Sequence, residues 1–245
     1  MEKPKHFGLI GRNISYSFSK GYFSKKFEKE NLEGYSYENF DIQDIRDFRD
    51  IAEKDISGLN ITIPYKESVI PYLDKLSKTA NVIGAVNTIK FTKKGKLKGY
   101  NTDFYGFKKS LKPLLQEHHK NALILGTGGA SKAIAFALDQ LGIAYQLVSR
   151  NTEKQVLSYK EVNAETFKTF HIIINCTPLG TFPDVEVCPE IPYDYFTAEH
   201  IAYDLIYNPA ETLFLQKAKK HGAVTKNGFD MLVFQAEKAW KIWNK

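Results

Sequence analysis

Short apolar runs alternate with amphipathic stretches along the first hundred residues. Some stretches repeat their apolar residues with the period of a strand, and others with helical spacing, as at Tyr22, Phe23 and Phe27. Strands are predicted at residues 6–11, 35–40 and 58–63, and helices at 20–29, 42–52 and 64–73. This strand–helix alternation is typical of a parallel α/β sheet. Residues 86–91 and 97–101 flank a lysine-rich turn and are expected to add a hairpin.

The same alternation starts afresh after residue 102. A helix is expected at 103–116, followed by a strand at 122–125, a glycine-rich turn, a helix at 130–141 and a strand at 144–149. The last four segments have the length of one βαβ unit with a right-handed crossover. Further strands are predicted at 172–175 and 202–206, and further helices at 210–221 and 228–243. The sequence therefore predicts two α/β domains, with a boundary near residue 102 and a cleft between them.

Composition places the chain among ordinary globular proteins. It has 245 residues, of which 43% are hydrophobic and 25% charged. Its apolar runs are far shorter than the ~18 residues of a membrane-spanning helix, and the first residues lack the apolar core of a secretory signal. The two cysteines, Cys176 and Cys188, form no CxxC pair and no cluster with metal-ligand spacing. We expect a cytoplasmic protein that needs no metal.

The net charge of +6 raises the question of a nucleic-acid partner. Only four of the 34 basic residues are arginines, at positions 12, 46, 49 and 150. Recognition of phosphates and base edges favours the guanidinium fork, and the densest basic run, residues 93–98, is expected in a turn facing water. The charge therefore indicates solubility and attraction of small anions rather than a nucleic-acid partner. No membrane partner is expected either.

A glycine-rich sequence, Gly126-Thr127-Gly128-Gly129-Ala130-Ser131, follows a predicted strand and opens a predicted helix. In a dinucleotide-binding turn the first glycine permits the tight bend, and the second lets the backbone approach a pyrophosphate at the helix N-terminus. Ser131 replaces the third glycine of the usual GxGxxG, and Gly129 is an additional one. The alternative is an ordinary strand–helix turn. The surrounding βαβ unit favours the nucleotide site.

The end of the next predicted strand indicates which dinucleotide is bound. An NAD site carries an acidic residue there for the ribose 2′-hydroxyl. Here Arg150 follows Ser149, with Thr152 and Lys154 close behind. A guanidinium binds a 2′-phosphate and stacks on adenine, so the sequence predicts NADP. The alternative is a surface arginine in a loop.

Polar residues in the first half occupy positions where a buried strand should be apolar. Asn60 and Thr62 share one strand face, and Lys66 lies at a predicted helix start. A single lysine is usually a solvated surface charge, but Asn87-Thr88 and Asn101-Thr102-Asp103 form a second polar cluster. Such groups at strand ends suit a polyhydroxylated substrate.

Two serines, Ser17 and Ser19, lie between the first predicted strand and the first predicted helix. Their hydroxyls can bind a small carboxylate near the helix start, or they can cap the helix. Asp103 likewise has the alternative role of a helix N-cap. The residues by themselves leave both roles open.

Eight sequence blocks follow one another in order along nearly the whole chain. They are Ser17-x-Ser19, 60–66 (NITIPYK), 84–88 (GAVNT), 99–103 (GYNTD), 126–130 (GTGGA), 175–180 (NCTPLG), 203–209 (YDLIYNP) and 227–236 (NGFDMLVFQA). In these blocks the chain resembles shikimate dehydrogenases, NADP-dependent enzymes of aromatic biosynthesis. The resemblance implies an N-terminal α/β substrate domain at residues 1–102 and a C-terminal Rossmann-like NADP-binding domain at 103–227, with a final helix at about 228–245 packing back on the first domain.

The resemblance also implies roles for individual residues. The substrate carboxylate is expected at Ser17 and Ser19, and the substrate ring with its hydroxyls at Thr62, Asn87, Tyr207 and Gln235. Lys66 and Asp103 are the implied catalytic pair, with Asp103 also contacting the substrate. The cofactor is expected at Gly126, Thr127, Gly128, Gly129, Ala130, Arg150, Thr152 and Lys154, with Thr177, Leu205 and Gly228 on the nicotinamide side.

Three features depart from the family pattern. Tyr16 and Lys20 stand near the serine pair where histidine and proline are usual, and Phe229-Asp230 is less usual in the last block. Only twenty residues separate Arg150 from His171, so we expect the cofactor domain to lack about one βα element.

The implied function is reversible NADPH-dependent reduction of 3-dehydroshikimate to shikimate. One alternative is a quinate/shikimate dehydrogenase of broader specificity, and Arg150 argues against the NAD preference that it would allow. A second alternative is a non-catalytic, ligand-sensing relative, which would not need both Lys66 and Asp103. The sequence leaves open whether the protein is a monomer or a homodimer.

Overall fold

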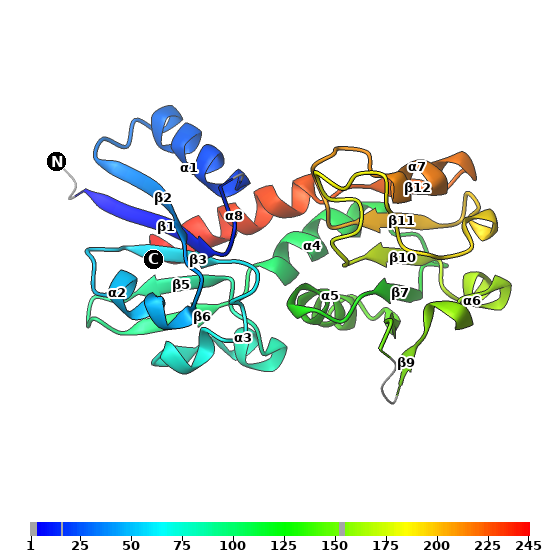
Figure 1. Ribbon diagram of the computed structural model, residues 1–245, viewed down its shortest axis with the longest axis horizontal. Helices are drawn as coiled ribbons and strands as arrows, with labels where there is room; N and C mark the ends of the chain where they lie inside the picture. Colours follow the sequence, from blue (N-terminus) through cyan, green and yellow to red (C-terminus); the bar gives the residue numbers. More distant parts are fainter. Residues whose placement is uncertain (1–3, 16, 152–154) are drawn as a thin grey trace. The chain divides into compact units, whose positions relative to one another are not determined.

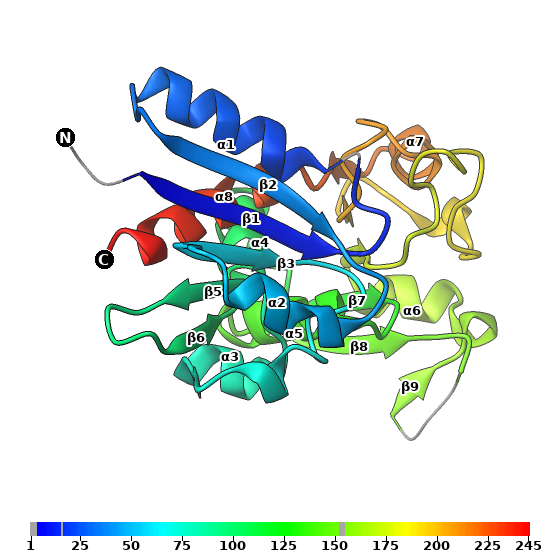
Figure 2. The same cartoon turned by 60° about the vertical axis from the view of Figure 1, so that its left-hand side comes forward.

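The computed structural model describes residues 4–15, 17–151 and 155–245, which divide into two compact units. The first unit is the chain up to Thr102 together with Ala236–Lys245, and the second is Asp103–Gln235. Figure 1 labels the elements and Figure 2 shows them from a second direction. Helix α8 (Phe229–Trp243) begins in the second unit and ends in the first.

The first unit is built on a six-stranded mixed sheet in the order β2-β1-β3-β5-β6-β4. Its strands are β1 (Lys5–Gly11), β2 (Tyr35–Asp41), β3 (Gly58–Ile61), β4 (Lys75–Leu76), β5 (Thr88–Phe91) and β6 (Leu97–Tyr100). Strand β1 is parallel to both β2 and β3, whereas β5 is antiparallel to both β3 and β6. The expected parallel sheet and its added hairpin are both present.

Helices pack on both faces of this sheet because the strands turn apolar side chains alternately to each face. The helices are α1 (Phe18–Lys29), α2 (Phe48–Ala52) and α3 (Lys78–Ile83), with the 3₁₀ turns η1 (Ile45–Asp47) and η2 (Ile70–Tyr72). On one face, Phe23 of α1 and Trp243 of α8 pack against Phe7 of β1. On the other, Phe48 of α2 packs in a cluster with Leu59 of β3.

The end of α8 is fixed to the first unit by Trp243. Its indole Nε1–H donates to the Ile89 carbonyl (3.0 Å), and the ring lies directly over Gly58. A Cβ at Gly58 would come within 2.4 Å of that ring, so this position has room for the indole only because it is glycine. Gly58 of β3 therefore makes room for Trp243 of α8, which lies 185 positions later in the chain.

The structure differs from the expectation after Pro64. Residues 66–69 form turns and Ile70–Tyr72 is a single 3₁₀ turn, so the predicted helix at 64–73 is wrong. Pro71 has no N–H to donate and disfavours α-helical geometry at the residue before it. The following helix α3 was not predicted because its six residues are too few to show a period; Ser77 caps it by accepting from Ala80 N–H (3.1 Å).

The second unit is a six-stranded sheet in which every neighbouring pair is parallel, in the order β12-β11-β10-β7-β8-β9. Its strands are β7 (Asn121–Leu125), β8 (Ala144–Val148), β9 (Val156–Leu157), β10 (Ile172–Asn175), β11 (Ile201–Asp204) and β12 (Val224–Lys226). Numbered from β7, this is the 3-2-1-4-5-6 order of the Rossmann fold. The predicted fold class is confirmed.

Helices cover both faces of this second sheet as well. They are α4 (Asp103–Leu111), α5 (Gly129–Asp139), α6 (Ala164–Thr169) and α7 (Leu213–Lys220), with the 3₁₀ turns η3 (Lys112–Leu114), η4 (Tyr159–Glu161) and η5 (Tyr193–Tyr195). Phe107, Ile134 and Met231 bring α4, α5 and the start of α8 onto one face. Phe167 and Phe214 bring α6 and α7 onto the other. Within the described residues, no helix is long and apolar enough to cross a membrane.

The expected loss of a βα element between Arg150 and His171 is wrong. Strand β9 has two residues and helix α6 has six, so both elements are shortened rather than missing. Helix α6 is stabilised at its start by Asn163, whose side-chain oxygen accepts from the N–H groups of Glu165 and Thr166. Elements of this length leave almost no periodic signal in a sequence.

Candidate active site

A network of buried amides and hydroxyls lies between β3 and β5 in the first unit. Asn87 Nδ2 donates to Thr102 Oγ1 (2.9 Å), and Asn87 Oδ1 accepts from Thr102 N–H (2.7 Å). Asn60 Nδ2 donates to the Asn87 carbonyl (3.1 Å), and the Tyr37 hydroxyl donates to Asn60 Oδ1 (2.7 Å). Each of these bonds satisfies a polar group that burial would otherwise destabilise. The network therefore fixes the orientation of Asn87.

Lys66 lies in the turn after β3, and its backbone is joined to this network. The Lys66 carbonyl accepts from Val86 N–H (2.7 Å), one residue before Asn87. Because this segment is a turn, the helix start expected at Lys66 is wrong, and the dipole of a helix beginning there does not act on the ammonium.

Asp103 comes directly after Thr102 in the chain. It is 6% exposed and is the first residue of α4. Thr102 is held by both its backbone N–H and its hydroxyl to the Asn87 side chain. The polar network thus links the turn that carries Lys66 to the residue that precedes Asp103.

The loop after β1 ends at Ser17, and Ser19 is a buried residue in the first turn of α1. Ser17 caps α1, since its Oγ accepts from Ser19 N–H (3.2 Å). Earlier in the loop, the carboxylate oxygens of Asp41 accept from the N–H groups of Asn13 (2.9 Å) and Ile14 (3.1 Å). A hydroxyl that accepts one hydrogen bond can still donate another, so capping and carboxylate binding are compatible at Ser17.

The other predicted substrate residues are divided between the units. Thr62 is half-buried at the end of β3, where its N–H donates to the Ile10 carbonyl (2.9 Å). Tyr207 is half-buried in the loop after β11, and Gln235 is 7% exposed on α8. Thr62, Lys66 and Asn87 therefore lie in the first unit, and Tyr207 and Gln235 in the second.

The glycine-rich turn of the second unit has the backbone of an anion site. Gly126 has a φ of +104°, a conformation that favours glycine. Gly128 caps α5 in an extended conformation, and a Cβ there would meet nothing within 4 Å. Helix α5 has eleven residues, so its first N–H groups and its dipole favour a phosphate at this open end. These residues fit a dinucleotide pyrophosphate.

Arg150 follows β8 and is exposed, at the position where an NAD site would carry an acidic residue. The loop closes beside it, because Ser149 N–H donates to the Leu157 carbonyl (2.9 Å). Burial raises the pKa of nearby Tyr159, and the positive charge of Arg150 opposes that shift. The predicted cofactor residues Thr152 and Lys154 lie outside the described residues.

A second buried network, around Asp204, lies at the ends of β10 and β11. The carboxylate of Asp204 accepts from Asn175 Nδ2 (3.1 Å), Ile206 N–H (3.0 Å) and the Thr212 hydroxyl (2.6 Å). Complete burial raises the pKa of Asp204 to about 6. Asn175 Oδ1 in turn accepts from Thr177 N–H (3.0 Å) and the Thr177 hydroxyl (2.7 Å). No role was predicted for Asn175 or Asp204, although polar residues at the ends of apolar strands gave a signal for both.

The residues predicted for the nicotinamide side are placed by this network. Gly228 N–H donates to the Ile206 carbonyl (3.0 Å), and a Cβ at Gly228 would lie 2.0 Å from the Leu205 carbonyl oxygen. Only glycine therefore lets the chain enter α8 against the backbone of Leu205. Thr177 borders the glycine-rich turn, because its Cγ2 lies 3.2 Å from the position that a Cβ on residue 126 would occupy.

Known proteins are similar to this chain along nearly its whole length. The model of the shikimate dehydrogenase substrate binding domain matches residues 9–89. The shikimate dehydrogenase (NADP(+)) of Methanococcus maripaludis is 38% identical over an alignment that covers 98% of this chain and 92% of the relative. The chain belongs to the shikimate dehydrogenase family.

Two solved structures show how closely the fold of this shikimate dehydrogenase family member follows its relatives. Shikimate 5-dehydrogenase of Thermus thermophilus, in complex with NADP(H) and shikimate, is 31% identical with a TM-score of 0.86, covering 98% of this chain and 93% of that one. Quinate dehydrogenase of Corynebacterium glutamicum, in complex with NAD, is 25% identical with a TM-score of 0.87, covering 99% of this chain and 94% of that one.

In residues 4–15, 17–151 and 155–245, no group of three or more His, Cys, Asp or Glu side chains is arranged to hold a metal ion.

Proposed function

We propose that this chain catalyses the reversible NADPH-dependent reduction of 3-dehydroshikimate to shikimate in aromatic biosynthesis. The observation that carries the proposal is the Asn87–Thr102 network, which binds the Lys66 turn and leads directly into Asp103. Family membership supports it, as does the Thermus thermophilus relative bound to NADP(H) and shikimate.

Lys66 and Asp103 are the proposed catalytic residues. As the ketone of the substrate is reduced, negative charge grows on its oxygen, and the Lys66 ammonium stabilises that charge and donates the proton. The Asp103 carboxylate orients the ammonium and contacts the substrate. In the oxidative direction Lys66 accepts the proton from the substrate hydroxyl.

The remaining polar residues are proposed to hold the substrate. Ser17 and Ser19 donate hydroxyl hydrogen bonds to its carboxylate, at the start of a twelve-residue helix that also favours an anion. The fixed amide of Asn87, with Thr62, Tyr207 and Gln235, contacts the ring and its hydroxyls. A rigid donor–acceptor set of this kind suits a polyhydroxylated ligand better than an apolar one.

The cofactor is proposed to bind along the carboxyl ends of β7 and β8. NADPH supplies the hydride when it is bound. Residues 126–130 accommodate its pyrophosphate, Arg150 with Thr152 and Lys154 its 2′-phosphate, and Thr177, Leu205 and Gly228 its nicotinamide. The arginine fork in place of an acidic residue supports NADP over NAD.

A quinate/shikimate dehydrogenase of broader specificity is the second candidate. The observation that favours this second candidate is the shared fold of the Corynebacterium glutamicum quinate dehydrogenase, which was solved in complex with NAD. The two candidates differ in substrate and cofactor range, so both can be measured in one assay series. A monomer or homodimer in the cytoplasm stays a prediction from the sequence.

The test is to follow NADPH absorbance with purified protein and 3-dehydroshikimate, then with NADH, and then with 3-dehydroquinate. We expect turnover only when NADPH is combined with 3-dehydroshikimate. Turnover with 3-dehydroquinate and NADH would instead establish the broader enzyme. No turnover with any pair would identify a non-catalytic relative.

The Lys66→Ala variant tests the catalytic assignment within the same assay. We expect kcat to fall by about 100-fold or more while KM changes little, because the Lys66 interaction develops mainly in the transition state. Lys93→Ala, which removes an exposed lysine of the β5–β6 turn, is the matched control. A large rise in KM with kcat intact would make Lys66 a binding residue only.

A further inference from the structure

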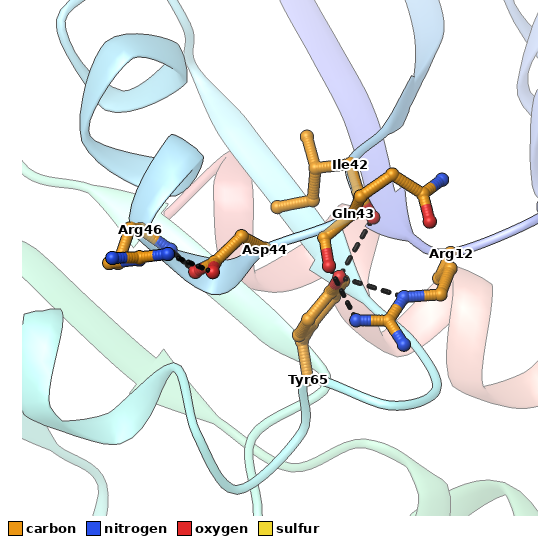
Figure 3. Close-up of polar contacts among 6 residues, drawn as sticks. All are labelled: Arg12, Ile42, Gln43, Asp44, Arg46 and Tyr65. Carbon is orange, nitrogen blue, oxygen red and sulfur yellow. Dashed lines mark hydrogen bonds and ion pairs between the residues drawn. The ribbon is translucent and has the colours of Figure 1, made fainter.

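Arg12, the residue after β1, connects two neighbouring loops through its guanidinium (Figure 3). Its Nε donates to the Tyr65 hydroxyl (3.3 Å), and a terminal nitrogen donates to the Gln43 carbonyl. The guanidinium carbon lies 5.6 Å from the centroid of the Tyr65 ring, within the range of a cation–π contact. The Arg12 backbone N–H also donates to the Ile63 carbonyl (3.2 Å). Arg12 is thus an exposed residue with a fixed head group.

Tyr65 transmits these contacts to Lys66, which directly follows it. Tyr65 is 3% exposed, and its hydroxyl donates to the Ile42 carbonyl (2.8 Å) while accepting from Arg12. Its own N–H donates to the Thr62 carbonyl (2.9 Å). The turn has one α-type bond, from Val69 N–H to the Tyr65 carbonyl (3.0 Å), but it is not part of a helix. The contacts of Tyr65 and the bond between Val86 N–H and the Lys66 carbonyl therefore help to hold its backbone.

The loops that meet at Arg12 follow three adjacent parallel strands. Strands β2, β1 and β3 lie side by side, so their carboxyl ends share one edge of the sheet. The loop after β2 supplies the carbonyls of Ile42 and Gln43, and the loop after β3 supplies Tyr65. The loop after β1 runs from Arg12 to Ser17, and Ser19 follows in the first turn of α1. Arg12 therefore joins the serine loop to the lysine turn.

We propose that Arg12 is a positioning residue for Lys66. Through Tyr65 it fixes the turn that carries the lysine relative to the loop that leads to Ser17 and the start of α1. The inference rests on the proposed function, because it takes Lys66 as the catalytic group. The competing role for Arg12 is a direct contact with the substrate carboxylate, which would change substrate affinity rather than the chemical step.

Steady-state kinetics of three variants separate these roles. For Arg12→Ala and Tyr65→Phe we expect kcat to fall about tenfold, equivalent to about 1.4 kcal/mol, with little change in either KM. Arg12→Lys keeps the charge but loses the planar guanidinium fork, so its kcat should fall nearly as far as that of Arg12→Ala. Arg46→Ala is the matched control, because Arg46 is exposed in the 3₁₀ turn η1 after β2 and pairs with Asp44 (2.7 Å; Figure 3). A rise in substrate KM with kcat preserved would overturn the proposal.

A double-mutant comparison tests whether Arg12 acts through Lys66. In the Lys66→Ala background, adding Arg12→Ala should lower the residual kcat no further, because the positioned group is already gone. A second tenfold loss in that background would show an effect independent of Lys66 and would overturn the proposal.

Amide hydrogen exchange gives a readout that needs no substrate. The Val86 N–H reports on the Lys66 turn, and the Ser77 N–H, bonded to the Gly99 carbonyl (2.8 Å), reports on the same unit elsewhere. Arg12→Ala should speed exchange at Val86 about tenfold and leave Ser77 unchanged. Equal acceleration at both amides, or none at Val86, would overturn the positioning role. If the wild-type protein fails to turn over, the proposed function fails, and exchange still decides the role of Arg12.

Discussion

Replacing Gly128 by alanine should separate folding from cofactor binding. Gly128 is the N-cap of α5, with φ −72° and ψ 179°, a backbone conformation that any residue adopts. A Cβ built there meets no atom within 4 Å. In the absence of cofactor the methyl group would therefore project into open space, at the point where a dinucleotide turn must approach its pyrophosphate.

Two small opposing effects set the stability of the Gly128→Ala variant. Alanine is a poorer N-cap than glycine by about 0.5–1.5 kcal/mol, whereas the lower entropy of the unfolded chain gains about 0.4–1 kcal/mol. The free energy of unfolding should therefore stay within about 1 kcal/mol of wild type. Loss of one charge-assisted hydrogen bond to phosphate costs about 1.5–3 kcal/mol, so KM for NADPH should rise about 10- to 100-fold.

Urea denaturation and steady-state kinetics measure the two quantities on the same preparation. Gly21→Ala is the control, since Gly21 lies in α1 and a Cβ there also meets nothing within 4 Å. That variant should gain up to about 1 kcal/mol from helix propensity and keep its KM for NADPH. An unchanged KM in Gly128→Ala, or a loss of stability well beyond 1 kcal/mol, would refute the reasoning that this glycine is kept for the ligand.

Four further outcomes follow from the structure. Arg150→Ala should raise KM for NADPH about tenfold and leave KM for NADH nearly unchanged, and equal losses would refute the 2′-phosphate role. Gly228→Ala should lower the free energy of unfolding by about 1–3 kcal/mol in urea titrations, because the new Cβ would meet the Leu205 backbone at 2.0 Å; wild-type stability would contradict it. Trp243→Ala should lower the free energy of unfolding by about 3–5 kcal/mol, and Trp243→Phe should lower it less. A smaller loss in Trp243→Ala would mean that α8 is held by other contacts. Burial lowers the pKa of His119 below its ordinary 6.5, so its neutral form stabilises the fold above pH 6.5 and that stability is lost as pH falls through the folded-state pKa; melting temperatures that do not drop between pH 7.5 and 5.5 would contradict this.

The sequence predicted strand β10 and the long helices well and the six-residue helices badly. Strand β10 was placed at its observed residues 172–175, because four successive β-branched or amide residues bounded by loops leave little ambiguity. Helices α3 and α6 were missed because six residues do not complete two helical turns. The helix predicted at 64–73 was wrong because Pro71 and tertiary hydrogen bonds outweigh local propensity.

Residue types alone indicated the buried polar network of the first unit. Asn60 and Asn87 stood out because an amide inside an apolar strand must have a hydrogen-bond partner, and each amide has one in the folded chain. Asp204 also ends an apolar strand, but its network was not predicted. One of its hydrogen-bond partners, Thr212, lies eight residues further along the chain, beyond the strand.

The sequence by itself determined the alternation of strands and helices, the glycine-rich turn, the arginine in place of an acidic residue at the end of β8, and the family. These depend on local residue type and spacing, which the chain displays directly. Only the tertiary structure decided that Lys66 sits in a turn held by Val86 and Tyr65, and that Arg12 is joined to that turn. Contacts between residues more than fifty positions apart depend on which strands lie side by side, and periodicity carries no information on strand order.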